Sequence, residues 1–104
     1  MRKYRVEFLR SAANDLFDLY DMIAAEAGSA VAGTTIERIE AACLILETSP
    51  LRGTKRDDLA SGLRTVGFER RATIVFRIRG SAVTIVRVFY GGQNYERVLR
   101  SSYN

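Results

Sequence analysis

Residues 82–90 read AVTIVRVFY, and this segment is the clearest indication of the fold because it is apolar on both faces of a potential strand. A strand with two apolar faces is typical of the centre of a sheet that other elements cover. Gly80-Ser81 precedes it and favours a two-residue hairpin turn. Residues 70–80 alternate apolar and polar side chains, so they predict the neighbouring strand. Residues 63–69 (LRTVGFE) predict a third strand of the same sheet.

The segment before the sheet has a helical period. Between residues 11 and 48, apolar side chains recur at intervals of three and four residues, with a break at Gly28. Ser11 is a suitable N-cap for the first helix and Ser29 for the second, while Ser49-Pro50 would end the second. The pattern therefore predicts a helical hairpin.

The two ends of the chain and one loop complete the outline. Residues 3–9 (KYRVEFL) place Tyr4, Val6 and Phe8 on one face, as in a half-buried strand that must pair within the sheet. Residues 51–62 are polar and predict a loop, and the segment from Asn94 onward predicts a short strand or helix. We expect one α+β domain over residues 1–104. It has an N-terminal strand, a helical hairpin and an antiparallel sheet of three to four strands.

The composition excludes several kinds of chemistry. The 104 residues contain no histidine and one cysteine, Cys43, so a zinc site, a Ser-His-Asp triad and a Cys-His pair are all excluded. No metal or cofactor is expected, and Cys43 falls within the apolar stripe of the second helix as a core residue. No signal peptide is expected, because the first ten residues interleave charged and apolar side chains, and no apolar run approaches the roughly 18 residues of a transmembrane helix. With its lone cysteine, the protein is expected in the cytoplasm and not in a membrane.

Charge is unevenly distributed. Residues 11–48 contain seven acidic side chains and one basic, whereas residues 49–104 contain eleven basic and four acidic. The basic half either attracts nucleic acid or an acidic polypeptide, or it is a solvated surface. Its basic residues are spread over strands and are not collected on a recognition helix, so direct DNA binding is not expected.

Arg87 stands out within the central strand. Because it lies among apolar neighbours, where an unpaired charge is costly, we expect it to pair with a carboxylate of this chain or of a partner. Arg77 and Arg79 either have a functional role or are solvated residues on the surface of the sheet. Tyr90 either has a functional role or is a core residue whose hydroxyl lies at the edge of the core.

Five segments form a pattern along nearly the whole chain: YRVEFLRSAANDLFDLYDMIAAE, SPLRG, GLR, IVFRI and IVRVFYGGQNYERVL. In this order and spacing they resemble the ParE/RelE superfamily, the toxins of bacterial type II toxin–antitoxin systems. The ParE branch is favoured by the matched positions Gly62-Leu63-Arg64, Phe76-Arg77, Arg87-Val88 and Tyr90-Gly91-Gly92-Gln93-Asn94. The sequence departs from that branch at Tyr90, where histidine is common, and at Gln93, where arginine is common.

The resemblance implies that the chain is the toxin of a plasmid-stabilisation system. Such a toxin inhibits DNA gyrase by binding to it and needs no catalytic residue. The expected target-binding residues are Arg64, Arg77, Arg87, Tyr90 and Gln93. The resemblance also implies a ParD-like antitoxin with a ribbon-helix-helix DNA-binding domain and a tail that folds on the toxin. Its expected contacts are the apolar Phe17 and Tyr20, and the basic Arg71 and Arg79 for an acidic tail.

The alternative is a RelE-like endoribonuclease that cleaves mRNA on the ribosome. In that reaction Arg64, Arg77 and Arg87 would bind the phosphate, and Tyr90 would act as base or acid. A tyrosine with the usual pKa of about 10 is a poor base at neutral pH unless nearby arginines lower that pKa. The RelE branch also tends to have lysines in the later sheet, whereas the two lysines here, Lys3 and Lys55, lie elsewhere. Both observations favour the gyrase-directed toxin.

Overall fold

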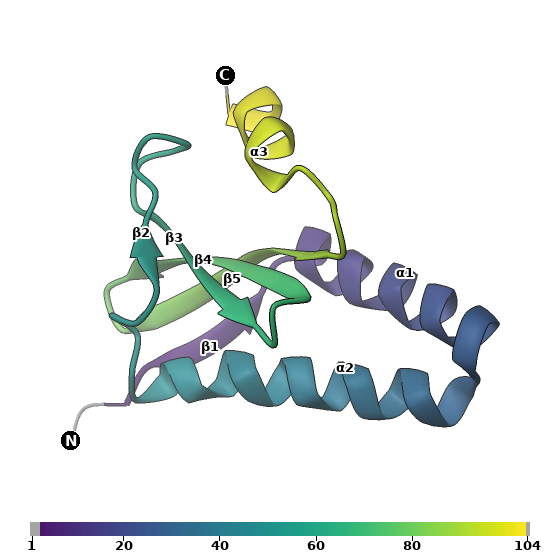
Figure 1. The fold of residues 1–104 in the computed structure, drawn as a ribbon. Helices are drawn as coiled ribbons and strands as arrows, with labels where there is room; N and C mark the ends of the chain where they lie inside the picture. Colours follow the sequence, from purple (N-terminus) through teal and green to yellow (C-terminus); the bar gives the residue numbers. More distant parts are fainter. Residues whose placement is uncertain (1–2, 104) are drawn as a thin grey trace.

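The structure is a computed structural model that describes residues 3–103. Its elements, in chain order, are β1 (Arg5–Phe8), α1 (Arg10–Ala27), α2 (Ser29–Leu44), the 3-10 helix η1 (Ile45–Glu47), β2 (Thr54–Lys55), β3 (Leu63–Phe68), β4 (Ala72–Arg79), β5 (Ala82–Tyr90) and α3 (Tyr95–Tyr103). Figure 1 shows α2 below the sheet, α1 to its right and α3 above it. The predicted α+β class, with strand, helical hairpin and sheet in that order, is confirmed.

The sheet has five strands in the order β1-β5-β4-β3-β2. β3, β4 and β5 form the predicted antiparallel meander, and Arg79 pairs with Ala82 across the Gly80-Ser81 turn. The sheet differs from the expectation because β1 pairs in parallel with β5, which makes it mixed, and because β2 adds a further strand. Val6 of β1 lies opposite Val83, so the parallel register brings the apolar side of β1 to the hairpin core.

One face of the sheet packs against the helical hairpin. The core between them contains Leu16, Leu19 and Ile23 of α1, Ile39 and Cys43 of α2, and Ile74, Phe76, Val83, Ile85 and Val88 of the sheet. Cys43 has no exposed surface, which confirms its prediction as a core residue. Burial raises the pKa of this thiol to about 12, with a smaller contribution from the negative charge of Glu40.

The predicted helix caps are wrong. α1 begins at Arg10 with Leu9 at its N-cap, because the Leu9 N–H still donates to the Ile85 carbonyl at 3.0 Å and the chain turns directly from sheet to helix. Gly28, at φ 95°, ends α1 and also occupies the N-cap of α2, so Ser29 is already helical. Ser11 has another role, since its hydroxyl donates to the Val86 carbonyl at 2.7 Å.

The opposite face of the sheet carries a second apolar core. Its buried side chains are Leu59, Leu63, Val75, Val86, Phe89 and Leu99, with Tyr95 and Val98 packed against them. Leu99 belongs to α3, so the terminal segment is a helix, one of the two predicted alternatives. β5 is thus covered on both faces, which explains why its sequence is apolar throughout.

Two connections differ from the sequence prediction. The predicted loop 51–62 contains β2, which follows Gly53 at φ 85°. A Cβ on Gly53 would lie 2.2 Å from the Thr65 carbonyl oxygen, so this position requires glycine. The predicted strands 63–69 and 70–80 are both shorter, because Glu69 and Arg70 have positive φ and form the β3–β4 turn.

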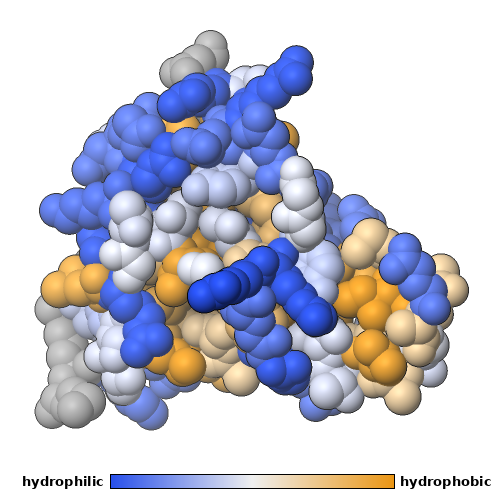
Figure 2. Space-filling model, in the orientation of Figure 1, coloured by the Kyte–Doolittle hydropathy of each residue, from blue (hydrophilic) through white to orange (hydrophobic). Residues whose placement is uncertain are grey.

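The surface has distinct regions. Figure 2 shows hydrophilic residues over α3 at the top, and hydrophobic residues at the tip of the hairpin where α1 meets α2. Met22 and Val31 near this tip are about half exposed. Within residues 3–103, no helix combines the length and hydropathy that crossing a bilayer requires.

Candidate functional site

Side chains complete the outer edge of β5. β1 ends at Phe8, opposite Ile85, while β5 continues to Tyr90. Along this remaining edge, the Val88 N–H donates to the Asp15 carboxylate at 2.8 Å, and the Tyr90 N–H donates to the side-chain carbonyl of Gln93 at 2.9 Å. α1 and the β5–α3 linker therefore take the place of a neighbouring strand, because buried backbone groups require partners.

Arg87 pairs with Asp15 at this edge. Its Nε donates to Asp15 Oδ2 at 2.8 Å and its Nη2 to Oδ1 at 2.9 Å, a bidentate arrangement. The two side chains are 26% and 15% exposed. The Arg87 guanidinium also lies 4.6 Å from the centre of the Phe89 ring. The expectation that Arg87 pairs with a carboxylate is confirmed, and that carboxylate belongs to this chain.

A pocket of about 340 Å³ opens beside this ion pair, and we refer to it as the β5-edge pocket. Its lining includes Asp15, Arg87, Tyr90 and Gln93, together with Asp18 and Met22 of α1. Tyr90 is half-buried and packs against the hairpin core, so its ring is part of the core while its edge faces the pocket. The pocket combines a fixed guanidinium, an aromatic ring, an amide and carboxylates, and three of the five predicted target-binding residues meet there.

Arg64 and Arg77 lie away from this pocket and on opposite faces of the sheet. Arg64 is opposite Phe76, a residue of the hairpin core, whereas Arg77 is opposite Leu63, a residue of the core under α3. Side chains of directly opposed residues lie on the same face, which separates the two arginines. Arg64 Nη2 donates to the Leu51 carbonyl at 2.7 Å, and its side chain lines a smaller pocket of about 220 Å³.

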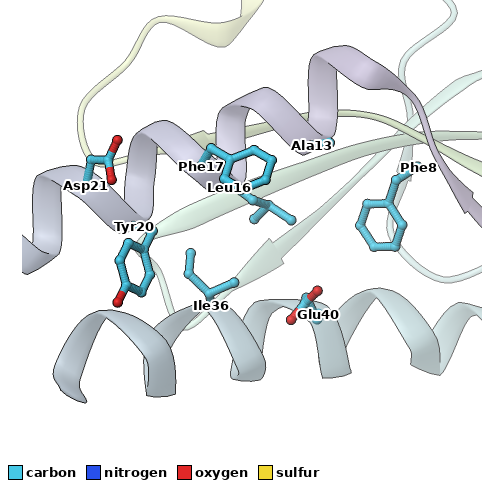
Figure 3. A pocket seen from close by; sticks show the side chains of 8 residues that line it. All are labelled: Phe8, Ala13, Leu16, Phe17, Tyr20, Asp21, Ile36 and Glu40. Atoms are coloured by element: carbon cyan, nitrogen blue, oxygen red, sulfur yellow. The ribbon is translucent and has the colours of Figure 1, made fainter. Parts of the chain in front are cut away.

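The predicted antitoxin contacts divide into two groups. Phe17 is 70% exposed and Tyr20 is 37% exposed, and both line an apolar groove of about 540 Å³ between α1 and α2, here termed the hairpin groove. Figure 3 shows Leu16, Phe17 and Tyr20 projecting from α1 on the side of the groove that faces Ile36 of α2. Arg71 and Arg79 are exposed at the two ends of β4, and neither lines this groove.

Phe8 also lines the hairpin groove, a position that the sequence pattern did not predict. It is the last residue of β1, lies opposite Ile85 and is 36% exposed. The alternation of Tyr4, Val6 and Phe8 correctly predicts that Phe8 lies on the same face of β1 as the other two. That Phe8 reaches the groove between the helices was not predictable from this alternation.

A charged cluster that the sequence did not indicate anchors α3. Arg56 donates to Asp58 at 2.9 and 2.8 Å, to Glu96 at 2.5 Å and to the Tyr95 hydroxyl at 3.2 Å. These hydrogen bonds raise the pKa of Arg56 and lower the pKa of the Asp58 carboxyl. Because Tyr95 and Glu96 begin α3, Arg56 fixes the helix over the second core. No group of three acidic or cysteine side chains among residues 3–103 could hold a metal ion.

Comparison with known proteins places the chain among bacterial toxins. Residues 6–95 match the family model described as the ParE toxin of the type II toxin–antitoxin system parDE. Toxin ParE3 of Caulobacter vibrioides is 31% identical over 90 residues, which cover 86% of this chain and 89% of the relative. The chromosomal ParDE system of P. aeruginosa contains a chain that superposes with a TM-score of 0.76 at 26% identity, covering 86% of this chain and 97% of that one.

A second solved structure is also similar to the chain. A chain of the toxin–antitoxin complex RelBE2 of Mycobacterium tuberculosis superposes with a TM-score of 0.61 at 27% identity, covering 89% of this chain and 97% of that one. The expected ParE/RelE-like fold is therefore confirmed. The structural likeness is higher for the ParDE chain than for the RelBE2 chain.

Proposed function

Because the chain belongs to the ParE family of type II toxin–antitoxin toxins, we propose that it acts in the cytoplasm by binding and inhibiting DNA gyrase. The observation that carries this proposal is the family match, which extends over residues 6–95 and includes both the hairpin and the sheet. Inhibition by binding requires a rigid surface and no catalytic group of its own.

The β5-edge pocket is the proposed target contact. Arg87 is oriented by Asp15, and Gln93 is oriented by the Tyr90 N–H, so both side chains are held before a partner arrives. Such preorganisation reduces the entropy lost on binding. Arg64 and Arg77 would contact the target outside this pocket, which limits them to secondary contacts.

The second candidate function is ribosome-dependent mRNA cleavage, which the likeness to the RelBE2 chain keeps open. Cleavage requires cations, a base and an acid around one phosphate. Arg64 and Arg77 occupy opposite faces of the sheet, and Arg87 is engaged by Asp15. This separation supports a binding toxin over a nuclease.

A ParD-like antitoxin is the proposed neutralising partner. The hairpin groove offers it exposed apolar surface at Phe17 and Tyr20, as grooves that receive amphipathic segments do. Arg71 and Arg79 would serve a separate acidic part of the tail at the sheet.

The deciding experiment compares purified toxin in a gyrase supercoiling assay and in a translation reaction whose mRNA is mapped for cuts. The proposal expects loss of supercoiling or accumulation of cleaved DNA with gyrase, and intact mRNA on ribosomes. Tyr90→Phe keeps the ring and removes the hydroxyl, so it should retain most gyrase inhibition but would abolish cleavage in which Tyr90 acts as acid or base. Codon-positioned mRNA cuts that disappear in Tyr90→Phe would replace gyrase inhibition with the nuclease function.

A further inference from the structure

The smaller pocket beside Arg64 lies at the outer edge of the sheet, where β2 is the last strand. Figure 1 shows β2 next to β3 at this edge. We refer to the pocket as the β2-edge pocket. Its volume is about 220 Å³, and its lining residues are Lys55, Asp57, Gly62, Leu63, Arg64 and Ile78. It shares no lining residue with the β5-edge pocket, so the two are separate sites.

Two positive charges face each other in this pocket. Lys55 of β2 pairs directly with Arg64 of β3, so the two side chains lie on the same face of the sheet. Like charges at directly opposed positions destabilise a sheet. Within residues 3–103, neither side chain has an ion pair that would relieve this repulsion. An anion between the two would relieve it.

Arg64 also retains unused hydrogen-bond donors. Its Nη2 donates to the Leu51 carbonyl at 2.7 Å, which fixes the direction of the side chain. Its Nε is buried and has no hydrogen-bond partner within residues 3–103. A guanidinium has several N–H groups and no acceptor, and a buried donor without a partner costs free energy. The guanidinium is therefore held in place but incompletely satisfied.

The one acidic residue of the pocket does not neutralise these cations. Asp57 Oδ1 accepts the Gly62 N–H at 2.8 Å, and Asp57 forms no ion pair with Lys55 or Arg64. Its carboxylate thus supports the turn before β3. The three charged residues of the lining leave one net positive charge, which suits a small anion and not a cation.

We propose that the β2-edge pocket binds a phosphate group between Lys55 and Arg64. Phosphate oxygens point in several directions and can accept from both side chains at once, whereas a carboxylate paired side-on with Arg64 directs both oxygens to the guanidinium. The site differs from the cluster considered for mRNA cleavage, because Arg77, Arg87 and Tyr90 do not line it.

The phosphate group has two chemical sources, a free phosphate compound and the backbone of DNA. The second source rests on the proposed function, since gyrase acts on DNA. A phosphate contact positions a protein on DNA without reading its sequence, so this source requires no recognition helix.

The first test measures the thermal unfolding midpoint of the full-length toxin near pH 7. The buffers contain about 50 mM phosphate, acetate or chloride at equal ionic strength. A ligand that binds only the folded state raises this midpoint, but phosphate also stabilises proteins generally because it is excluded from their surface. We therefore expect the rise from chloride to phosphate to be at least about 3 °C larger in the parent than in Lys55→Gln. Acetate should produce no such difference.

Matched variants separate the pocket from the general surface charge. In chloride, Lys55→Gln should melt no lower than the parent, because it removes a like-charge contact. Lys55→Glu should melt higher than the parent in chloride, since it places a carboxylate opposite Arg64, and it should lose the specific response to phosphate. Arg71→Gln removes one exposed positive charge outside the pocket and should respond to phosphate as the parent does.

The second test identifies the source with a fluorescently labelled DNA duplex of about 20 base pairs. If DNA supplies the phosphate, Lys55→Gln should bind the duplex at least about threefold more weakly than Arg71→Gln at about 0.1 M salt. If the two variants bind it equally while the specific phosphate response remains, the source is a free phosphate compound. Neither test requires gyrase, so failure of the proposed target leaves the phosphate response unchanged.

The proposal fails if the parent and Lys55→Gln respond equally to phosphate, because the effect is then general exclusion of the salt. It also fails if acetate gives the same rise and Lys55→Gln loses it, since the pocket would then take a carboxylate. A lower midpoint of Lys55→Glu than of the parent in chloride would contradict the repulsion between Lys55 and Arg64 on which the site depends.

Discussion

Asp15 and Arg87 form a bidentate ion pair in which Asp15 Oδ2 also accepts the Val88 N–H at 2.8 Å. The carboxylate therefore links α1 to both the side chain and the backbone of β5. Asp15→Ala should lower the free energy of unfolding by about 2–4 kcal/mol, since it removes the ion pair of a largely buried guanidinium and leaves an edge N–H unsatisfied. Arg87→Ala should cost about 1–2 kcal/mol, because Asp15 keeps the Val88 N–H.

Urea unfolding of Asp15→Ala, Arg87→Ala and the double variant measures the coupling energy between Asp15 and Arg87. A gyrase assay with Arg87→Ala measures the part of Arg87 in toxicity. Asp18→Ala, one turn later on α1 and without an ion pair among residues 3–103, is the control and should stay within about 0.5 kcal/mol of the parent. If Arg87→Ala changed neither the free energy of unfolding nor the inhibition of gyrase, the Asp15–Arg87 ion pair would contribute to neither stability nor toxicity.

Gly53 should be intolerant of any side chain. A Cβ there would lie 2.2 Å from a backbone oxygen of β3, and the positive φ adds strain, so Gly53→Ala should cost about 3 kcal/mol or more. Gly62→Ala provides the comparison, because Gly62 has a similar φ of 80° but open space around its Cα, and about 1 kcal/mol is expected. Thermal melts of the two variants that coincide would refute the steric argument.

The attachment of α3 should weaken in acid. Hydrogen bonds from Arg56 lower the pKa of Asp58, so the contribution of Asp58 is present above its ordinary pKa of about 3.9 and is lost as the pH falls through the lower folded value. Asp58→Asn should therefore reduce the urea midpoint at pH 6, and this reduction should become smaller as the pH falls below about 3.9. Asp18→Asn, at a carboxylate without an ion pair among residues 3–103, is the control for the loss of one negative charge. A reduction by Asp58→Asn that stays constant from pH 6 into the acid range would contradict the role of charge.

Cys43 should report unfolding. Burial raises the pKa of its thiol to about 12, so at pH 8 the folded protein holds a protonated and inaccessible sulfur. A thiol-specific chromogenic reagent should react slowly in buffer and quickly in urea, with one equivalent per chain because Cys43 is the single cysteine. Equal rates in the two solvents would contradict the buried position.

The raised pKa of Cys43 also makes stability depend on pH. The stability that the neutral thiol contributes declines as the pH rises from the ordinary pKa of a cysteine toward about 12.

The parts of the fold that depend on local periodicity were predictable from the sequence. The stripe containing Ile39 and Cys43 and the two-faced apolar run of β5 each reflect the burial of that element, so pattern alone identifies them. β2 was not predictable, because two residues are too short to show a period. The caps failed for a related reason: Ser11 has the chemistry of an N-cap, but a long-range contact with Val86 determines its position.

The candidate site was predictable only in part. The apolar neighbours of Arg87 require a counter-charge, yet the choice of Asp15 depends on how α1 docks against β5, across 72 residues of sequence. Likewise, sequence spacing places Arg64 and Arg77 on adjacent strands, but their separation to opposite faces follows from the β3–β4 register. A shift of one residue in that register would have put them together.

The parallel pairing of β1 with β5 determines when this protein can become active during its synthesis. β1 is an edge strand whose partner is β5, so a nascent chain that ends before Ala82 cannot complete the sheet. Stalled ribosome-bound chains of that length should be digested by a protease that spares the finished protein. The hairpin groove uses residues 8–40, whereas Arg87, Tyr90 and Gln93 come later in the chain and leave the ribosome after them. In the order of translation, the surface proposed for neutralisation precedes the surface proposed for toxicity.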